Sequence, residues 1–238
     1  AVPAVYGMLN EFAGADARSS GLKFAISGAA PLPVEVMKKF KTNTGIEILE
    51  GYGCTEGTCM VAVNPPYGKR KLGSVGFPIP FTQVKVLKQG KDDAWEETKP
   101  NEIGSVCMQG KHVFKGYLEE EDNRSVWIDH LGERFYNTGD LGKYDSDGYL
   151  WLTGRSKELI IRGGHNIDPL SVESPFYEHV AVELVAAVGR PDERVGELPV
   201  VYVQLRSGAI ATPEELFVFV SSRIHEKSAL PKEVMIID

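Results

Sequence analysis

Short apolar runs separated by glycine, proline and aspartate restrict the fold of this chain more than any other feature of its sequence. The 238 residues include 25 glycines and 14 prolines. Alternating apolar and polar residues over 22–28 and 82–87 predict strands, because successive side chains of a strand face opposite sides. Apolar periodicity over 34–45, ending at Gly45, predicts an intervening helix. We therefore expect a mixed α/β and α+β protein that is rich in strands.

The pattern changes near residues 154–157. Strand-like runs dominate up to that point. Beyond it, strands alternate with two helix starts, one at Asp168 and one at the capping box of residues 212–215. We therefore predict a strand-rich body over residues 1–156 and a small α+β unit over residues 157–238, joined by a hinge-like turn.

Charge and composition narrow the class of protein. The formal net charge of −7 and the pI near 5.4 argue against a nucleic-acid-binding surface. No apolar run reaches the roughly 18 residues that a membrane-spanning helix needs, and no signal-peptide pattern is present. The cysteines form no CxxC pair and the histidines no HExxH pattern, which argues against a zinc site. We expect a cytoplasmic protein with reduced thiols.

The stretch GYGCTEGT, residues 51–58, is the first candidate binding loop. It is not a Walker phosphate loop, because no lysine follows its glycines. Its glycines would let the backbone approach a flat ligand, and the ring of Tyr52 offers a face for stacking. Thr55 adds a hydroxyl and Glu56 a carboxylate of the kind that Mg²⁺ prefers. A strand-to-loop turn with incidental polar residues explains the same pattern, so both interpretations stay open at this point.

Two further stretches place polar groups beside glycines. Asp140 follows a glycine in YNTGDLG, where its carboxylate can accept hydrogen bonds from two ribose hydroxyls, each worth roughly 1.5–3 kcal/mol. An Asx turn is the alternative. Arg155 lies fifteen residues further along, and Gly163 with Gly164 offers bare backbone to a thin ligand chain. A solvated basic hairpin is the alternative for this second stretch.

Seven stretches, taken together and in their order, resemble motifs of the adenylate-forming superfamily of acyl- and aryl-CoA synthetases, luciferases and peptide-synthetase adenylation domains. They are SGAAPLP (27–33), GYGCTEG (51–57), GSVGFPIP (73–80), NEIGSVCMQG to FKGY (101–117), YNTGDLG (136–142), GRSKELIIRGGHNI (154–167) and AAVGRPDERVGE (186–197). The resemblance covers nearly the whole chain. Within the superfamily, the sequence is most similar to acyl-CoA synthetases of the fatty-acid–CoA ligase type.

This resemblance implies a two-step reaction and a two-domain fold. A carboxylate attacks the α-phosphate of ATP in the presence of Mg²⁺, giving an acyl-adenylate and pyrophosphate. The thiol of coenzyme A then displaces AMP to form a thioester. Residues 1–156 would form the C-terminal part of the large adenylating domain, a β-rich subdomain, and residues 157–238 an incomplete, mobile small domain.

The resemblance also implies nucleotide contacts for seven residues. They are Gly28, Ala29, Ala30, Tyr52, Asp140, Leu152 and Arg155. The backbone of residues 28–30 would line the adenine edge, and Leu152 would pack near the base. Tyr52 would stack on adenine, which is worth roughly 1–3 kcal/mol. Asp140 and Arg155 would bind the ribose hydroxyls.

Catalytic, hinge and coenzyme A roles are implied in the same way. Thr55 would bind the α-phosphate, and Glu56 would hold Mg²⁺, whose charge offsets the negative charge that develops at phosphorus. Lys157 occupies the hinge position, about which the small domain would swing between two poses. Gly163 and Gly164 would then edge the pantetheine tunnel of coenzyme A.

Two motifs of the family are not found in this sequence: the Ser/Thr/Gly-rich phosphate loop with its lysine, and the C-terminal lysine that steadies the carboxylate. We therefore expect a C-terminal fragment of an acyl-CoA synthetase that makes little or no adenylate by itself. Its expected partners are a carboxylic acid, such as a fatty acid, and coenzyme A, with no nucleic acid and no membrane span.

Other interpretations of the same motifs stay open. They are an adenylation domain that serves a carrier protein or a luciferase-like oxygenase, a non-catalytic adenylate-binding module, and a purely structural piece. The sequence decides neither the acid nor the oligomeric state.

Overall fold

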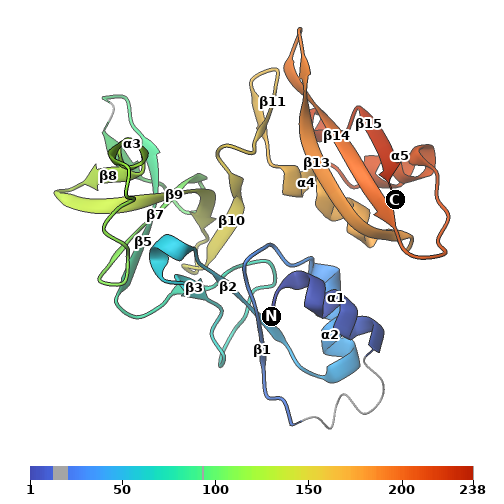
Figure 1. Cartoon of the computed structure of the whole chain (residues 1–238), viewed down its shortest axis with the longest axis horizontal. Helices are drawn as coiled ribbons and strands as arrows, with labels where there is room; N and C mark the ends of the chain where they lie inside the picture. Colours follow the sequence, from blue (N-terminus) through green and yellow to red (C-terminus); the bar gives the residue numbers. More distant parts are fainter. Residues whose placement is uncertain (13–20, 93, 238) are drawn as a thin grey trace. The chain divides into compact units, whose positions relative to one another are not determined.

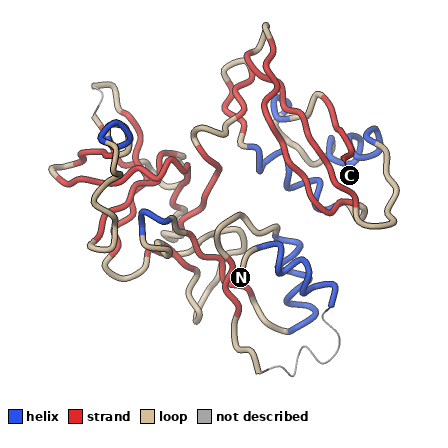
Figure 2. The backbone as a smooth tube through the Cα atoms, in the orientation of Figure 1, coloured by secondary structure: helices blue, strands red, loops and turns tan. Residues whose placement is uncertain are grey.

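The computed structural model describes residues 1–12, 21–92 and 94–237. The chain divides into two compact units, Ala1–Thr153 (the first unit) and Gly154–Asp238 (the second unit). This division lies three residues before the boundary that we predict after residue 156. Each unit combines helices with a sheet that has parallel and antiparallel pairs, as Figure 1 and Figure 2 show, so the predicted fold class is confirmed. Among the described residues, no helix has both the length and the apolar character needed to cross a membrane.

Two helices and a four-stranded sheet open the first unit. These elements are α1 (Pro3–Phe12), β1 (Ala25–Ser27), α2 (Val34–Thr44), β2 (Ile48–Tyr52), β3 (Ala62–Val63) and β4 (Phe77–Pro78). Strand β2 pairs in parallel with β1 and antiparallel with β3. Strand β3 in turn pairs antiparallel with β4. The helices bury Tyr6, Met37 and Phe40 against Ala25 and Ile48 of the strands. One hydrophobic cluster therefore holds this part of the unit together.

A six-stranded antiparallel sheet forms the rest of the first unit. Its strands are β5 (Thr82–Gln89), β6 (Trp95–Glu97), β7 (Gly104–Gly110), β8 (Trp127–His130), β9 (Glu133–Tyr144) and β10 (Leu150–Arg155), with the short helices η2 (Thr55–Gly57) and α3 (Glu120–Asn123) outside it. The strand order is β10-β9-β7-β5-β6, and β8 pairs with β9. Residues of both sheets share a core, in which Tyr52 and Val61 join Val106, Tyr136 and Leu150. This core fixes the end of β2 against the larger sheet.

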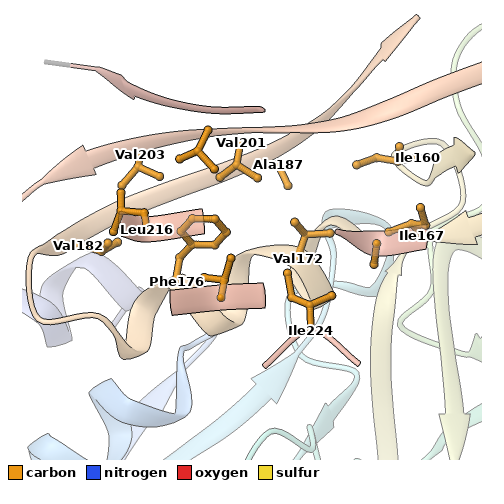
Figure 3. Close-up of a cluster of buried hydrophobic side chains, with 13 residues drawn as sticks. Ile160, Ile167, Val172, Phe176, Val182, Ala187, Val201, Val203, Leu216 and Ile224 are labelled. Atoms are coloured by element: carbon orange, nitrogen blue, oxygen red, sulfur yellow. The ribbon is translucent and has the colours of Figure 1, made fainter. Parts of the chain in front are cut away.

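The second unit is a five-stranded sheet packed on helices. Its elements are β11 (Ile160–Arg162), β12 (His165–Ile167), α4 (Pro169–Glu173), η3 (Ser174–Glu178), β13 (Val182–Asp192), β14 (Gly196–Leu205), α5 (Pro213–Ser221), η4 (Lys227–Ala229) and β15 (Glu233–Ile237). Figure 3 shows Val201 and Val203 of β14 above Phe176 and Leu216 of the helices. All four side chains are fully buried. The second unit therefore has a core of its own.

Local sequence signals set the ends of the helices. Gly45 follows α2 with a φ of 76°, a left-handed conformation that glycine adopts without strain. Asp168 caps α4 by accepting a hydrogen bond from the amide of Leu170, and Thr212 caps α5 by accepting one from the amide of Glu215. These contacts confirm the helix end predicted at Gly45 and the two predicted helix starts.

A buried carboxyl group lies in β2. Glu50 is 9% exposed, and its Oε2 accepts a hydrogen bond from the amide of Gly73 at 3.0 Å. Burial raises the pKa of Glu50 to about 7, because desolvation outweighs the backbone hydrogen bonds that favour the charged form. The folded protein therefore holds this proton more tightly than the unfolded chain, in which the pKa is about 4.5.

We expect the first unit to lose stability as the pH rises toward neutrality. Protonated Glu50 contributes fully below about pH 4.5, and this contribution, about 3 kcal/mol at most, is lost as the pH rises through about 7. Urea denaturation from about pH 5 to about pH 8, followed by tryptophan fluorescence, reports on this unit alone, because Trp95, Trp127 and Trp151 all lie in it. Glu50→Gln should flatten the profile, and the exposed control Glu133→Gln should keep it. If the free energy of unfolding of Glu50→Gln changed with pH as steeply as that of the unmodified chain, the expectation would be wrong.

Candidate functional site

The loop after β2 folds back tightly on itself. A Cβ atom on Gly53 would lie 1.5 Å from the carbonyl oxygen of Cys59, so only glycine fits there. Thr58 and Cys59 have φ values of 51° and 80°, a left-handed conformation that residues with side chains rarely adopt. Just before them, helix η2 presents Thr55, which is exposed, and Glu56, which is half-buried. Backbone strain of this kind concentrates at functional sites.

A hydrogen bond joins this loop to β9. The hydroxyl of Tyr52 donates to Oδ2 of Asp140, which is 2.5 Å away and 88 residues further along the chain. The amide of Asp140 donates to Oγ1 of Thr138 at 3.1 Å, and that hydroxyl donates to the carbonyl of Val106. Burial, and then the charge of Asp140, raises the pKa of Tyr52, so its phenol is a neutral donor. The structure thus brings the predicted base platform and the predicted ribose ligand together.

The ring of Tyr52 is itself part of the core. The residue is only 8% exposed, and its ring packs in the cluster that the two sheets share. Leu152, which we expect near the base, packs against the same cluster. Tyr52, Asp140 and Leu152 therefore meet at one place in the first unit. The stacking of Tyr52 on adenine stays a prediction.

The predicted adenine edge, residues 28–30, follows β1. Because β1 and β2 run in parallel, the segments that follow them leave the same edge of the sheet. A Cβ atom on Gly28 would lie 3.2 Å from the carbonyl oxygen of Gly51, so the two segments are in close contact. Ala29 has a φ of 76°, again left-handed. The structure thus places residues 28–30 beside the start of the glycine loop.

Tyrosine side chains hold the carboxylate of Glu56. The hydroxyl of Tyr117 donates to Oε1 of Glu56 at 2.6 Å, and the hydroxyl of Tyr136 lies 2.9 Å from that of Tyr117. Phe114 packs edge-on against both tyrosine rings and stacks on Trp127. Burial opposes ionisation of Glu56, but hydrogen bonds led by that of Tyr117 outweigh it and lower the pKa of Glu56. Glu56 is therefore an oriented anion.

Sequence reasoning missed three residues of this site. Tyr117 lies in the stretch FKGY, and Tyr136 and Thr138 lie in YNTGDLG, but none of them is assigned a role from the sequence. Their position inside these stretches is the one signal that the sequence offers. Their hydrogen bonds depend on the pairing of distant strands, which local patterns do not specify.

The carboxylate of Glu56 suits a metal site in which substrate phosphates supply the other ligands. Within the described part of the chain, no three His, Cys, Asp or Glu side chains gather as metal ligands. Mg²⁺ is commonly held by one or two carboxylates together with substrate phosphates. The oriented carboxylate of Glu56, one residue after the exposed hydroxyl of Thr55, suits this arrangement.

Four of the predicted site residues lie in the second unit. Arg155 and Lys157 are exposed, and Arg155 lies 3.7 Å from the carboxylate of Glu158. Gly163 and Gly164 form the two-residue turn between β11 and β12, with φ values of 57° and 82°. Two positive φ values match the type I′ turn that hairpins favour, so hairpin geometry alone accounts for both glycines. Contact of these four residues with a ligand stays a prediction.

Two family models match the chain. The model of the AMP-binding enzyme matches residues 1–118, and the model of the AMP-binding enzyme C-terminal domain matches residues 171–238. The two matched segments occur in the order in which the chain's motifs predict a large and a small domain.

Individual relatives are similar over nearly the whole chain. The marinolic acid–CoA ligase of Pseudoalteromonas sp. (strain SANK 73390) is 42% identical over 236 residues, which cover 99% of this chain and 36% of that protein. The long-chain-fatty-acid–CoA ligase of Bacillus subtilis (strain 168) is 37% identical over 205 residues, which cover 86% of this chain and 36% of that protein. The structure of ATP-bound MatB from Rhodopseudomonas palustris is similar to this chain, with a TM-score of 0.89 and 32% sequence identity. The match covers 100% of this chain and 46% of the MatB chain.

The chain thus spans about a third of the length of these two curated relatives. The family models, the relatives and the matching structure all agree with the family that the sequence motifs resemble. The chain belongs to the AMP-binding family of adenylate-forming enzymes.

Proposed function

We propose that this chain is part of an AMP-forming acyl-CoA synthetase, which joins a carboxylic acid to coenzyme A and converts ATP to AMP and pyrophosphate. The hydrogen bond between Tyr52 and Asp140 carries this proposal, because it brings the two nucleotide-binding motifs to one place. The two curated relatives described above are CoA ligases, which supports the same reaction. Since the chain spans 36% of each of them, we assign the complete activity to the longer protein.

The first unit would hold the nucleoside. The carboxylate of Asp140, fixed by the hydroxyl of Tyr52, would accept hydrogen bonds from the ribose hydroxyls. The base would lie against the backbone of residues 28–30, with Tyr52 and Leu152 as its apolar neighbours. A buried carboxylate with a fixed rotamer loses little conformational entropy on binding, so a larger part of the free energy of each hydrogen bond contributes to affinity.

Thr55 and Glu56 would act at the phosphate end. The exposed hydroxyl of Thr55 would donate to the α-phosphate, and Tyr117 would keep the Glu56 carboxylate in place as the magnesium ligand. Bound Mg²⁺ neutralises part of the phosphate charge, which lets an anionic carboxylate approach phosphorus. The products of this step are the acyl-adenylate and pyrophosphate. The family's phosphate loop and C-terminal lysine are not among the 238 residues.

The second unit would serve the thiol step. Lys157 would act as the hinge, and the bare backbone of Gly163 and Gly164 would edge the path of pantetheine. We propose a fatty or other medium-sized acid as the substrate, which the long-chain-fatty-acid–CoA ligase among the relatives supports. A cytoplasmic location is also proposed, and the three free cysteines support it.

A chimeric ligase tests the proposed function. This chain would replace the matching part of the Bacillus subtilis long-chain-fatty-acid–CoA ligase, and thioester formation would be followed with ATP, Mg²⁺, coenzyme A and a panel of carboxylates. We expect acyl-CoA and AMP in equal amounts from the chimera, and neither product from the same chimera carrying Glu56→Gln. A folded chimera that binds AMP but forms no thioester would contradict the proposal and favour a non-catalytic module.

The 238 residues alone should bind AMP but show no carboxylate-dependent ATP–pyrophosphate exchange, because the family's phosphate loop and C-terminal lysine are not among them. Calorimetry with AMP and an exchange assay with labelled pyrophosphate measure the two properties. Robust exchange would show that the first step does not need those groups.

Tyr117→Phe is expected to weaken metal binding while leaving AMP binding unchanged. The substitution removes the 2.6 Å hydrogen bond that orients Glu56, which is worth roughly 1 kcal/mol. Mn²⁺ used in place of Mg²⁺ should therefore bind to the chain with ATP roughly 3- to 10-fold more weakly, as measured by electron paramagnetic resonance. Tyr67→Phe is the matched control, because Tyr67 is 85% exposed. Equal weakening of AMP and Mn²⁺ binding would indicate a general loss of structure instead.

A further inference from the structure

Tyr117 lies at the surface but is held at both its hydroxyl and its backbone. The residue is 36% exposed. Confining an exposed side chain to one rotamer costs conformational entropy, so several contacts are needed to hold it. The hydroxyl of Tyr117 contacts Glu56 and Tyr136, and its backbone is bound by the side chain of Asn123. Glu56 is the proposed magnesium ligand, whereas Tyr136 and Asn123 have no role in the reaction described above.

The hydroxyls of the two tyrosines form a hydrogen-bond chain with one direction. An ionised carboxylate only accepts, so the one hydroxyl proton of Tyr117 is used in the 2.6 Å bond to Oε1 of Glu56. The hydroxyl oxygen of Tyr117 then accepts from Tyr136, 2.9 Å away. Tyr136 is only 4% exposed, and its ring packs edge-on against those of Phe114 and Trp127. A buried donor thus fixes the direction in which Tyr117 donates.

The side chain of Asn123 fixes the backbone of Tyr117. Its Oδ1 accepts a hydrogen bond from the amide of Tyr117 at 2.8 Å, and its Nδ2 donates to the carbonyls of Tyr117 and Glu119 at 3.0 and 2.9 Å. Asn123 is the last residue of α3, a four-residue helix that buries none of its residues. Hydrogen bonds rather than apolar packing therefore attach α3 to this segment.

The chain segment that ends at Tyr117 also binds the loop that carries Glu56. The amide of Phe114 donates to the carbonyl of Glu56 at 2.8 Å, and Oγ1 of Thr58 donates to the carbonyl of His112 at 2.6 Å. These two bonds set the two segments in register, so the hydroxyl of Tyr117 stays within reach of the Glu56 carboxylate. Glu56 is thus held through both its backbone and its side chain.

We propose that Tyr136 and Asn123 are positioning residues of the magnesium site and act through Tyr117 on the carboxylate of Glu56. Tyr136 sets the direction of the Tyr117 hydroxyl, and Asn123 sets the place of its backbone. Hydrogen bonds in a chain strengthen one another, and hydrogen bonds to a ligating carboxylate orient it for the metal. This inference rests on the proposed function, in which Glu56 holds Mg²⁺.

Binding of Mn²⁺ with ATP to the 238-residue chain, followed by electron paramagnetic resonance, tests the inference. Tyr136→Phe and Asn123→Ala should each weaken Mn²⁺ at least about 3-fold and leave the affinity for AMP unchanged. The double variant Tyr117→Phe/Tyr136→Phe should bind Mn²⁺ no more weakly than Tyr117→Phe alone, because both changes break the same chain of hydrogen bonds. Effects that simply add would overturn the action of Tyr136 through Tyr117.

Two control variants separate positioning from stability. Tyr144 lies on β9 like Tyr136, and its hydroxyl donates to the carbonyl of Val84 at 3.0 Å, so Tyr144→Phe also removes a hydroxyl hydrogen bond from this strand. Asp122 is the exposed neighbour of Asn123 on α3. Tyr144→Phe and Asp122→Ala should leave Mn²⁺ binding unchanged, and thermal melting checks that all variants are folded. Equal weakening by Tyr136→Phe and Tyr144→Phe would overturn the proposal.

A spectroscopic measurement tests the hydrogen-bond chain without any ligand. In a chain labelled with ¹³C at Cζ of tyrosine, the signal of Tyr117 is assigned by its absence from Tyr117→Phe. It should shift in Tyr136→Phe but not in Tyr144→Phe, and an unshifted signal in Tyr136→Phe would overturn the chain. Unchanged Mn²⁺ binding in Glu56→Gln would overturn the metal role of Glu56 and this inference with it. A large effect of Glu56→Gln without any effect of Tyr136→Phe would overturn this inference alone.

Discussion

Asp140→Asn is expected to weaken the binding of AMP by at least about 100-fold. An ionised carboxylate that accepts two ribose hydroxyls gains roughly 1.5–3 kcal/mol from each, and about 3 kcal/mol in total corresponds to roughly a 100-fold change. Asparagine keeps an oxygen that can accept a hydrogen bond from the hydroxyl of Tyr52, so the variant can retain the link that the 2.5 Å hydrogen bond makes between the two chain segments. Calorimetry of the chain with AMP measures the effect.

A ligand without ribose hydroxyls separates recognition from structure. 2′,3′-Dideoxyadenosine monophosphate should bind the unmodified chain about as weakly as AMP binds Asp140→Asn. Its affinity for Asp140→Asn should be the same as its affinity for the unmodified chain. This pattern is the non-additivity expected when two changes remove one interaction. Asp129→Asn, an exposed substitution on β8 of the same sheet, is the control and should leave both affinities unchanged. If Asp140→Asn weakens both ligands by the same factor, Asp140 acts only through Tyr52.

Gly53→Ala is expected to destabilise the first unit by about 3 kcal/mol or more. The added Cβ would lie 1.5 Å from the carbonyl oxygen of Cys59 and 2.6 Å from its carbonyl carbon, so backbone rather than a flexible side chain has to move. For a unit of this size, such a loss lowers the midpoint of thermal unfolding by roughly 10 °C. Tryptophan fluorescence during heating measures it, since all three tryptophans lie in the first unit.

Gly7→Ala is the matched control for this substitution. Gly7 lies within α1, and no atom lies within 4 Å of the Cβ that alanine would add. Alanine favours a helix over glycine by roughly 1 kcal/mol, so this variant should be as stable as the unmodified chain or more so. A small effect of Gly53→Ala, similar in size to that of Gly7→Ala, would show that the loop relaxes without cost.

Much of the fold follows from local chemistry that the sequence displays. Gly45 ends α2 because glycine adopts a left-handed φ, and Thr212 begins α5 because its hydroxyl accepts the amide of Glu215. The pair Gly163-Gly164 forms a tight turn for the same reason as Gly45. Each of these features depends on a few neighbouring residues, so a single sequence is enough to predict it.

The contacts within the site depend on strand register instead. Tyr52 and Asp140 are both assigned to the nucleotide from their motifs, but their mutual hydrogen bond arises from the core that two different sheets share. Tyr117 reaches Glu56 across 61 residues, and no local pattern distinguishes it from other exposed tyrosines. The burial that shifts the pKa of Glu50 likewise depends on packing around β2. These parts of the site require the three-dimensional arrangement.

The turn between β9 and β10 bears on the order in which the molecule assembles. The carboxylate of Asp145 accepts hydrogen bonds from the amides of Asp147 and Tyr149 and from the indole of Trp151, all within six residues. Hairpins of this kind form in roughly 1–10 μs, whereas contacts between distant segments must close long loops first. The bond between Tyr52 and Asp140 closes a loop of 88 residues. The hairpin is therefore expected to form early and Tyr52 to meet Asp140 late, so the proposed nucleotide site should be completed only when the first unit has nearly finished folding.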